Sequence, residues 1–546
     1  MTSLQRGWLI VAIILLGLGE WTWASLHVLS RMTQVASTQL AQMKAAAPPP
    51  LPGKSHLFSR AEVYAFLDKA RQAEAIKDPL QRCLAYPDPP GSHWSAATVK
   101  AYCHYRMQPL MTFAQMQTLI QNGHAAELDR KLQALLDAST TQPGALGLFD
   151  HLFEQDFVGS FDIRPTLDAW KRDSPHSAFA YAASGYAYYK MAFRARGTAY
   201  MRDTPASNVE SMNRLLQQAD TDLRRAIALD PRVTPAYVAM IDAGGLSLGD
   251  RYVKEAARRG LAVAPANFAI YDALLWNAQP KWGGSLQAMV RLADQAQAHA
   301  AANPLLSLLL TKEPAYAVNV DNCDCHTAAQ LARYSQVFDR VSTVQLLLSA
   351  GYASESSHHP ELAVVYFSEA LRFDNDLPDE RLRRAFELNE FDESQWAVDD
   401  VTAMLKSAPD DERLLKVRGF SYESLNDYPH AVQDLQKALA LNPVDQPALL
   451  ELGNLYANIT HQWDKAWDIA NRAIKQFPHS PAGWILRAQI QRQQPRAGMR
   501  ATVADFAARF GHDPAQQKAL AWLRAQLALQ EGPRYHPGPG TRAAVH

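Results

Sequence analysis

The residues best suited to chemistry lie in one short segment, DNCDCH, at positions 321–326. The thiols of Cys323 and Cys325 and the imidazole of His326 could bind a soft metal such as copper or zinc, or the two thiols could cycle with a disulfide. A structural zinc site normally has four ligands, and the sequence has no second cysteine pair with the usual spacing. The alternative is a surface loop between two helical blocks, with a strained structural bridge or with thiols of no special use.

Other chemical motifs are weaker still. Gly53, Lys54 and Ser55 match the end of a phosphate-binding loop, but Pro48 stands where its first glycine belongs and no strand precedes it. The sequence has no GxSxG, HExxH or strand-associated GxGxxG motif. We therefore predict that the protein is not an enzyme and has no cofactor, although a catalytic pair assembled only in space would escape this search.

Cys83 and Cys103 bracket a proline-rich turn that runs into a predicted helix. A disulfide between them would close a loop of about twenty residues and contribute roughly 3 kcal/mol in the chain-entropy model. The alternative is a pair of free, buried thiols. We predict the disulfide, which requires an oxidising compartment.

The first thirty-one residues predict export. Arg6 precedes an uninterrupted apolar run, residues 7–19, which continues less strongly beyond Glu20 to Ser30. The whole stretch is about long enough to span a bilayer, whereas the first run alone has the length of a cleaved signal peptide that would end before Ser25. We predict a signal anchor over 1–31 in a bacterial inner membrane, with a polar helix and Pro-rich spacer over 32–56 and the bulk of the chain in the periplasm.

Composition and periodicity define the fold class. The 54 basic and 55 acidic residues give a net charge of -1, and no basic stripe interleaved with aromatics is present, so nucleic-acid binding is not expected. Apolar residues follow helical spacing almost throughout, which predicts an all-α protein. A Pro/Gly-rich end predicts a disordered tail over 532–546.

Two distant stretches are nearly identical: LRRAIALDP at 223–231 and LQKALALNP at 435–443. Each reads as the end of an amphipathic helix stopped by proline. The residues before Pro443 place large and small apolar side chains at fixed offsets, namely Leu415, Gly419, Tyr422, Ala431, Leu435 and Ala438. This pattern resembles the tetratricopeptide repeat (TPR), which implies a solenoid of stacked helix–turn–helix units. The small residues Gly419 and Ala431 would lie where the two helices cross closely.

Steps of 34 residues find further copies. They end at Asn375, Pro409 and, with one inserted residue near Gln462, at Pro478. A degenerate copy begins at Trp484 and is followed by a cap helix. The sequence therefore predicts a TPR-like α-solenoid array over 342–531, joined by a connecting segment, 316–341, to the preceding region.

The middle of the chain departs from the strict repeat. FRARG at 193–197, RAIALDP at 225–231 and PKWGGS at 280–285 together resemble DUF4034, a bacterial domain family of unknown function, over about 125–315. The resemblance implies TPR-like helices and makes Arg194, Arg196 and Trp282 candidate site residues, without an activity. A helical region over 57–124 precedes it.

The first helices of the repeat array predict a binding groove. Tyr352, Phe386, Phe420 and Asn454 recur every 34 residues and form an apolar-aromatic row, beside a polar row of Glu355, Asn389 and Glu423. Parallel rows of this kind suit an extended or helical peptide, because the aromatics supply buried area and the polar row sets direction. The alternative is that these side chains pack only against neighbouring helices.

The resulting prediction is a membrane-anchored scaffold or assembly factor of the cell envelope, which binds a protein or peptide without a chemical step. One alternative is a redox or metal-binding protein that uses Cys323, Cys325 and His326. Another is a structural subunit of a larger envelope machine.

Overall fold

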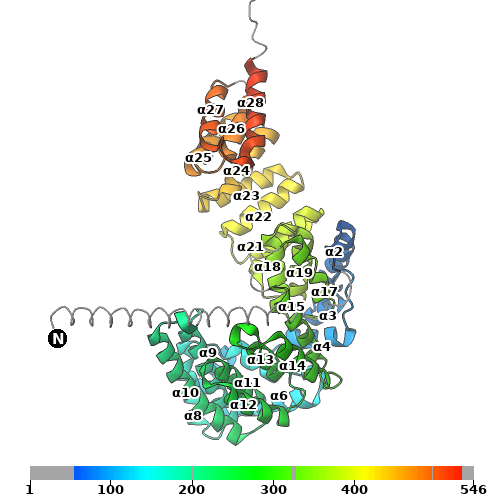
Figure 1. Cartoon of the computed structure of the whole chain (residues 1–546), viewed down its shortest axis with the longest axis vertical. Helices are drawn as coiled ribbons and strands as arrows, with labels where there is room; N and C mark the ends of the chain where they lie inside the picture. The colour runs from blue at the N-terminus through cyan, green and yellow to red at the C-terminus, as the bar shows by residue number, and fades with distance from the viewer. Residues whose placement is uncertain (1–54, 200, 321–326, 495, 532–546) are drawn as a thin grey trace, which may run out of the picture.

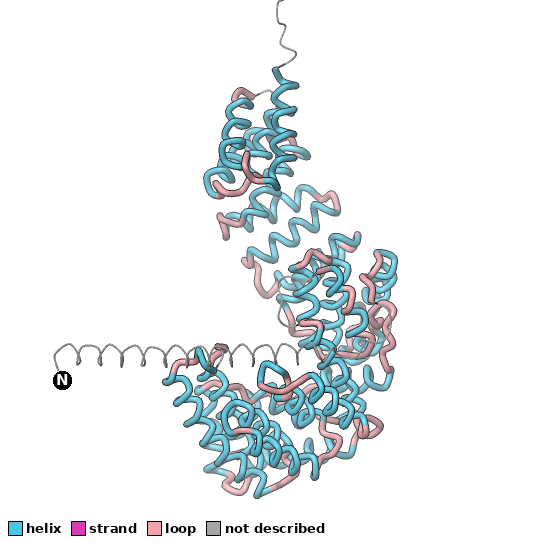
Figure 2. Tube along the Cα trace, in the orientation of Figure 1, coloured by secondary structure: helices cyan, strands magenta, loops and turns pink. Residues whose placement is uncertain are grey.

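The computed structural model describes residues 55–199, 201–320, 327–494 and 496–531, and within these ranges the chain is helical with no strand (Figure 2). The predicted all-α class is therefore confirmed for this part of the chain. The predicted anchor, most of the spacer and the predicted tail lie outside the described residues. Among the described helices, none is both long and apolar enough to cross a bilayer.

The chain folds into two lobes (Figure 1): the helices of the middle region form one, and the C-terminal array, with the N-terminal helices beside its first repeats, forms the other. The N-terminal and middle helices are α2 (Arg60–Glu74), α3 (Pro79–Ala85), α4 (Ala96–Met107), α5 (Phe113–Gln121), α6 (Ala125–Thr141), α7 (Leu148–Asp156), α8 (Arg164–Asp173), α9 (Ala178–Arg196), α10 (Ala206–Leu229), α11 (Thr234–Ala243), α12 (Asp250–Val263), α13 (Phe268–Asn277) and α14 (Leu286–Gln297). The connecting segment and the C-terminal array hold α15 (Lys312–Ala317), α16 (Ala328–Leu331), α17 (Tyr334–Val337), α18 (Val344–Ser356), α19 (Pro360–Phe373), α20 (Pro378–Leu388), α21 (Ser394–Leu405), α22 (Glu412–Ser424), α23 (Tyr428–Leu441), α24 (Gln446–Asn454), α25 (Trp463–Gln476), α26 (Ala482–Gln493), α27 (Met499–Phe510) and α28 (Gln517–Glu531).

Helical hairpins recur in both lobes, as the two similar stretches predict. Helices α9 and α10 pair closely, and a Cβ added at Gly185 would lie 2.6 Å from the Leu223 side chain. In the second lobe, a Cβ added at Gly419 would lie 2.9 Å from Leu435. A larger residue at either glycine would push the two helices apart, because neither contact has room for a methyl group.

The turns between paired helices repeat the same backbone conformation. His358, Asp392, Asn426 and His461 each have a positive φ, between 51° and 60°, and they are spaced by 34, 34 and 35 residues. The extra residue of the last interval is absorbed in the first helix, where a π-helical turn, η8 (Leu455–Ile459), follows α24. A π turn holds one residue more than an α turn, so the pairing of α24 with α25 is preserved.

An N-terminal clasp, defined as α2, α3 and α4, packs on the start of the C-terminal array and covers α19 (Figure 1). Every side chain of α19 from Leu362 to Phe373 is buried. In an isolated array the outer face of such a second helix would meet water. The clasp and the first C-terminal repeat therefore share one hydrophobic core, although they are some three hundred positions apart in the sequence.

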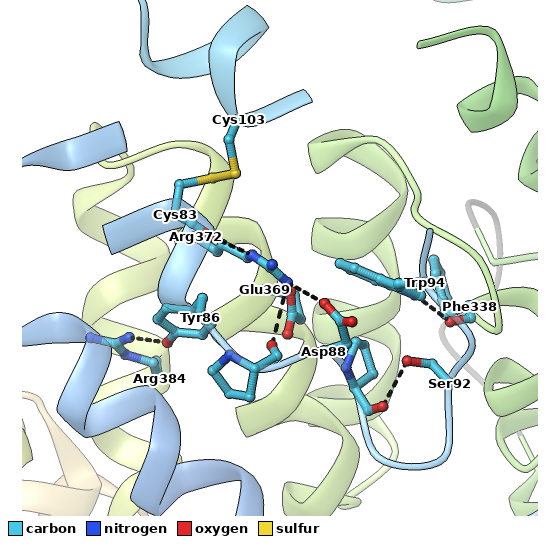
Figure 3. A network of polar contacts seen from close by, with 12 residues as sticks. Cys83, Tyr86, Asp88, Ser92, Trp94, Cys103, Phe338, Glu369, Arg372 and Arg384 are labelled. Carbon is cyan, nitrogen blue, oxygen red and sulfur yellow. Dashed lines mark hydrogen bonds and ion pairs between the residues drawn. A yellow bond between two sulfur atoms is a disulfide. The ribbon is translucent and has the colours of Figure 1, made fainter. Parts of the chain in front are cut away.

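Arg372 of α19 connects the clasp to the array by hydrogen bonds (Figure 3). Its Nε donates to the Cys83 carbonyl oxygen at 2.9 Å, and its Nη1 donates to carboxyl oxygens of Asp88 at 2.9 Å and Glu369 at 3.2 Å. Nearby, Trp94 Nε1 donates to the Phe338 carbonyl oxygen at 2.9 Å. These partners satisfy polar groups that would otherwise be costly to bury.

Cys83 and Cys103 form a disulfide between α3 and α4, with their Cα atoms 5.8 Å apart. Replacing both with alanine is expected to lower the free energy of unfolding by about 3 kcal/mol, because the open loop of the unfolded chain regains its freedom. Thermal unfolding with and without a reductant measures the effect. The reductant is expected to lower the Tm of the native protein and to leave the Cys83→Ala/Cys103→Ala variant unchanged. Equal responses from the two proteins would contradict the assignment.

Candidate functional site

The predicted apolar-aromatic row lies on four successive first helices of the C-terminal array, with its three aromatic members on the first three. Tyr352 on α18 is 36% exposed and Phe386 on α20 is 44% exposed, whereas Phe420 on α22 is half-buried. The Phe386 and Phe420 rings meet edge to face, with centroids 6.3 Å apart. Asn454, the last member, is half-buried on α24. The structure thus places two of the four side chains in substantial contact with solvent.

The polar row is largely occupied by partners within the chain. The Glu355 carboxylate pairs with the guanidinium of Arg383, which also lies 5.0 Å from the centre of the Tyr352 ring. The amide of Asn389 donates to the Phe386 carbonyl oxygen at 3.2 Å. Arg383 thus packs on the Tyr352 ring, whereas Asn389 bonds to the backbone of its own helix.

Two carboxyl groups beside the aromatic row have raised pKa values. Burial, together with the neighbouring Glu451, raises the pKa of Glu423 to about 8. Burial also raises the pKa of Glu387 to about 7, with a further contribution from the negative charge of Glu355. The surface beside the aromatic row therefore gains negative charge gradually as the pH rises through neutrality.

A pocket lies in the middle lobe, where sequence reasoning did not place a site. This acidic pocket has a volume of about 360 Å³ and is lined by helices α4, α7, α9, α11 and α13. Its carboxylates are Asp150, Glu154, Asp242 and Asp272. Its exposed aromatic rim includes Phe193 and Trp276.

The candidate residues of the middle region lie beside this pocket. Arg196 is buried, and its guanidinium lies 5.4 Å from the centre of the Trp282 ring. Trp282 in turn has its ring centroid 6.1 Å from that of Trp276 on the pocket rim. Arg194 points elsewhere and donates to the Gly159 carbonyl oxygen at 3.1 Å. The structure thus brings Arg196 and Trp282 together. Arg194 does not join them, because its guanidinium binds the Gly159 carbonyl oxygen instead.

A signal for the pocket was present in the repeat register. Tyr186 directly follows Gly185, as Tyr352 follows Gly351 in the C-terminal array. Asp242 and Trp276, at the ends of the next two first helices, are 34 residues apart. Extending the groove positions into the middle region would have found these three pocket residues.

Cys323, Cys325 and His326 lie outside the described residues. Within the described ranges, no group of three or more His, Cys, Asp or Glu side chains is arranged to hold a metal ion.

Several solved structures are similar to the chain. A thermophilic TPR protein of Thermus thermophilus, TTC0263, is 18% identical, with 34% of this chain and 99% of that chain covered and a TM-score of 0.30. Yeast Tom70 is 12% identical, with 86% and 96% covered and a TM-score of 0.31. The APC/C hetero-tetramer Cut9-Hcn1 is 11% identical, with 85% and 88% covered and a TM-score of 0.31.

No curated protein matches the chain. The model of a domain of unknown function, DUF4034, matches residues 112–246. The match ends before the predicted limit of 315, so it includes Arg194 and Arg196 but not Trp282. It contains α7 and α11, which supply three of the four carboxylates of the acidic pocket, and α9, which supplies Lys190 and aromatic side chains.

Proposed function

We propose that the protein is a membrane-anchored scaffold or assembly factor of the cell envelope, which binds a protein or peptide partner along the first helices of its C-terminal array. The observation that carries the binding role is the exposed aromatic row, in which Tyr352 and Phe386 reach solvent from adjacent repeats and Phe386 contacts Phe420. Exposed aromatic side chains held by their neighbours contribute large contact area at small entropic cost, as binding hot spots do.

The envelope location is supported by two features of the chain. The apolar run at the N-terminus predicts export, and the Cys83–Cys103 disulfide suits an oxidising compartment. A bilayer anchor would also raise the effective concentration of the scaffold for partners in the same membrane.

In-cell crosslinking of the tagged full-length protein, followed by pull-down, tests the groove. The Phe386→Ala/Phe420→Ala variant is expected to lose its main crosslinked partner by at least about tenfold, since each hot-spot side chain contributes about 2 kcal/mol or more. The matched control is Leu441→Ala/Val444→Ala, which removes two exposed apolar side chains outside the row and is expected to retain the partner.

Circular dichroism melting establishes that the groove variant is folded. Should the double variant unfold, Phe386→Ala alone replaces it, because that side chain is nearly half exposed. Recovery of the same partners by the folded groove variant and by the native protein would overturn the groove assignment. A flat, obligate contact elsewhere on the array would then be the better explanation.

A further inference from the structure

The acidic pocket of the middle lobe contains more negative than positive charge. Of its carboxylates, Asp272 pairs with Lys312 of α15 at 2.8 Å. Lys190 is the cation that lines the pocket, and its ammonium lies 5.4 and 5.5 Å from the ring centres of Tyr186 and Tyr189. Among the described residues, Asp150 and Asp242 have no Lys or Arg ion-pair partner.

Among these carboxyl groups, Asp150 has an oxygen that lacks a hydrogen-bond donor within the described residues. Its side chain lines the pocket, and the residue is 8% exposed. Its Oδ2 accepts a hydrogen bond from the Asn267 amide at 2.8 Å, and the Thr234 side chain is close enough to help lower the pKa of the carboxyl, but none of the described donors meets Oδ1 in hydrogen-bond geometry. A buried carboxylate oxygen without a donor is costly, so a ligand that donates to it would recover that cost.

The charged and aromatic groups around Asp150 indicate which kind of ligand could donate to it. Burial raises the pKa values of Asp150 and Asp242 to about 6, although the charge of Lys190 and hydrogen bonds from Tyr189 and Asn277 oppose the rise at Asp242, so at neutral pH both groups are mostly charged. Tyrosine faces and the exposed Trp276, 42% accessible, attract cations through their ring electrons. Lys190 already uses the two tyrosine rings in that way, and the Lys281 ammonium lies 4.3 Å from the centre of the Trp276 ring, so a bound cation would share or replace these contacts. The carboxylates are not arranged as a metal-binding set within the described residues.

We propose that the acidic pocket binds an organic cation, an ammonium or guanidinium group, which donates to Asp150 and lies near Asp242 against the aromatic rim. This site is separate from the aromatic row of the C-terminal array, and its ligand does not depend on the function proposed for that row. The volume of about 360 Å³ is sufficient for one basic side chain or a small organic amine.

The test is a calorimetric titration of the purified full-length protein with Nα-acetyl-lysine amide and Nα-acetyl-arginine amide. The uncharged isosteres, Nα-acetyl-norleucine amide and Nα-acetyl-citrulline amide, are the ligand controls. At least one charged probe is expected to bind at least about tenfold more tightly than its isostere, because a charged hydrogen bond to a buried carboxylate contributes about 1.5–3 kcal/mol. A short peptide with a single lysine, titrated in parallel, separates a protein side chain from a free amine as the source of the cation.

Two variants connect the binding to this pocket. Asp150→Asn is expected to weaken the charged probe at least about tenfold, and Trp276→Ala, at an exposed position, is expected to weaken it without altering the fold. The matched control is Asp250→Asn, which removes the same charge from a side chain that is 93% exposed at the start of α12. Equal affinities for charged and uncharged probes, or equal effects of Asp150→Asn and Asp250→Asn, would overturn the proposal.

Discussion

Replacing Arg384 with methionine is expected to lower the free energy of unfolding by about 3–5 kcal/mol. The guanidinium is fully buried, and it donates to carboxylate oxygens of Glu74 at 2.7 Å and Asp400 at 2.6 Å. Burial alone would raise the pKa of Glu74, but the charge and hydrogen bond of Arg384, together with the charges of Arg381 and Arg82, hold that pKa below its ordinary value. Methionine would fill much of the space and leave Glu74 and Asp400, both mostly buried, with, among the described residues, only the more distant guanidinium groups of Arg82 at 4.0 Å and Arg381 at 3.8 Å.

Urea titration followed by helical circular dichroism measures this loss, and hydrogen exchange in α2 and α20 locates it. The matched control is the neighbouring Arg383→Met, because Arg383 is half-exposed and pairs with Glu355 at the surface. That change is expected to cost less than about 1 kcal/mol. A loss no larger for Arg384 than for Arg383 would mean that the buried ion pairs do not hold the clasp.

The second large effect is a pH dependence centred on Glu369. Burial raises the pKa of this fully buried carboxyl from its ordinary 4.5 to about 8, although the charge of Arg372 opposes the rise. Between these pH values the folded protein keeps a proton that the unfolded chain has released, so raising the pH favours unfolding. The full shift corresponds to up to about 5 kcal/mol, at roughly 1.4 kcal/mol per tenfold change in proton affinity.

Hydrogen exchange in α19 at pH 5 and pH 8.5, corrected for intrinsic rates, measures this change. The native protein is expected to lose protection as the pH rises, and Glu369→Gln is expected to lose much less, because glutamine does not ionise. Glu361→Gln, in the first turn of the same helix, serves as the control and is expected to behave like the native protein. Parallel pH profiles for Glu369→Gln and the native protein would refute the assignment.

The repeat geometry could be predicted because it depends on local spacing. Gly419 lies against Leu435 where the pattern placed a close crossing, and α28 begins at Gln517, within the predicted cap helix. The extra residue near Gln462 was also detectable, but its position was not. The chain inserts it as the π-helical turn at Leu455, because a helix interior can absorb one residue while the positive-φ turn at His461 is kept.

The clasp and the acidic pocket could not be predicted in the same way. Trp94 and Phe338 are 244 residues apart, and nothing in the spacing of apolar residues in either segment indicates that the two residues lie together. Arg384 reads as an ordinary charged residue on an amphipathic helix until Glu74 covers it. The pocket joins side chains from five helices, so its carboxylates look like solvated helix positions when each helix is taken alone.

The clasp also determines the order in which contacts can form while the chain is being synthesised. Arg60 donates to the Glu390 carbonyl oxygen, 330 positions later, so the ribosome works for roughly tens of seconds before that partner exists. The disulfide spans only 20 positions and can join α3 to α4 during this interval. The middle lobe has its own core and can form meanwhile. Helices α18–α21 then complete the long-range contacts with the clasp. The later repeats fold onto an array whose first repeats are already packed.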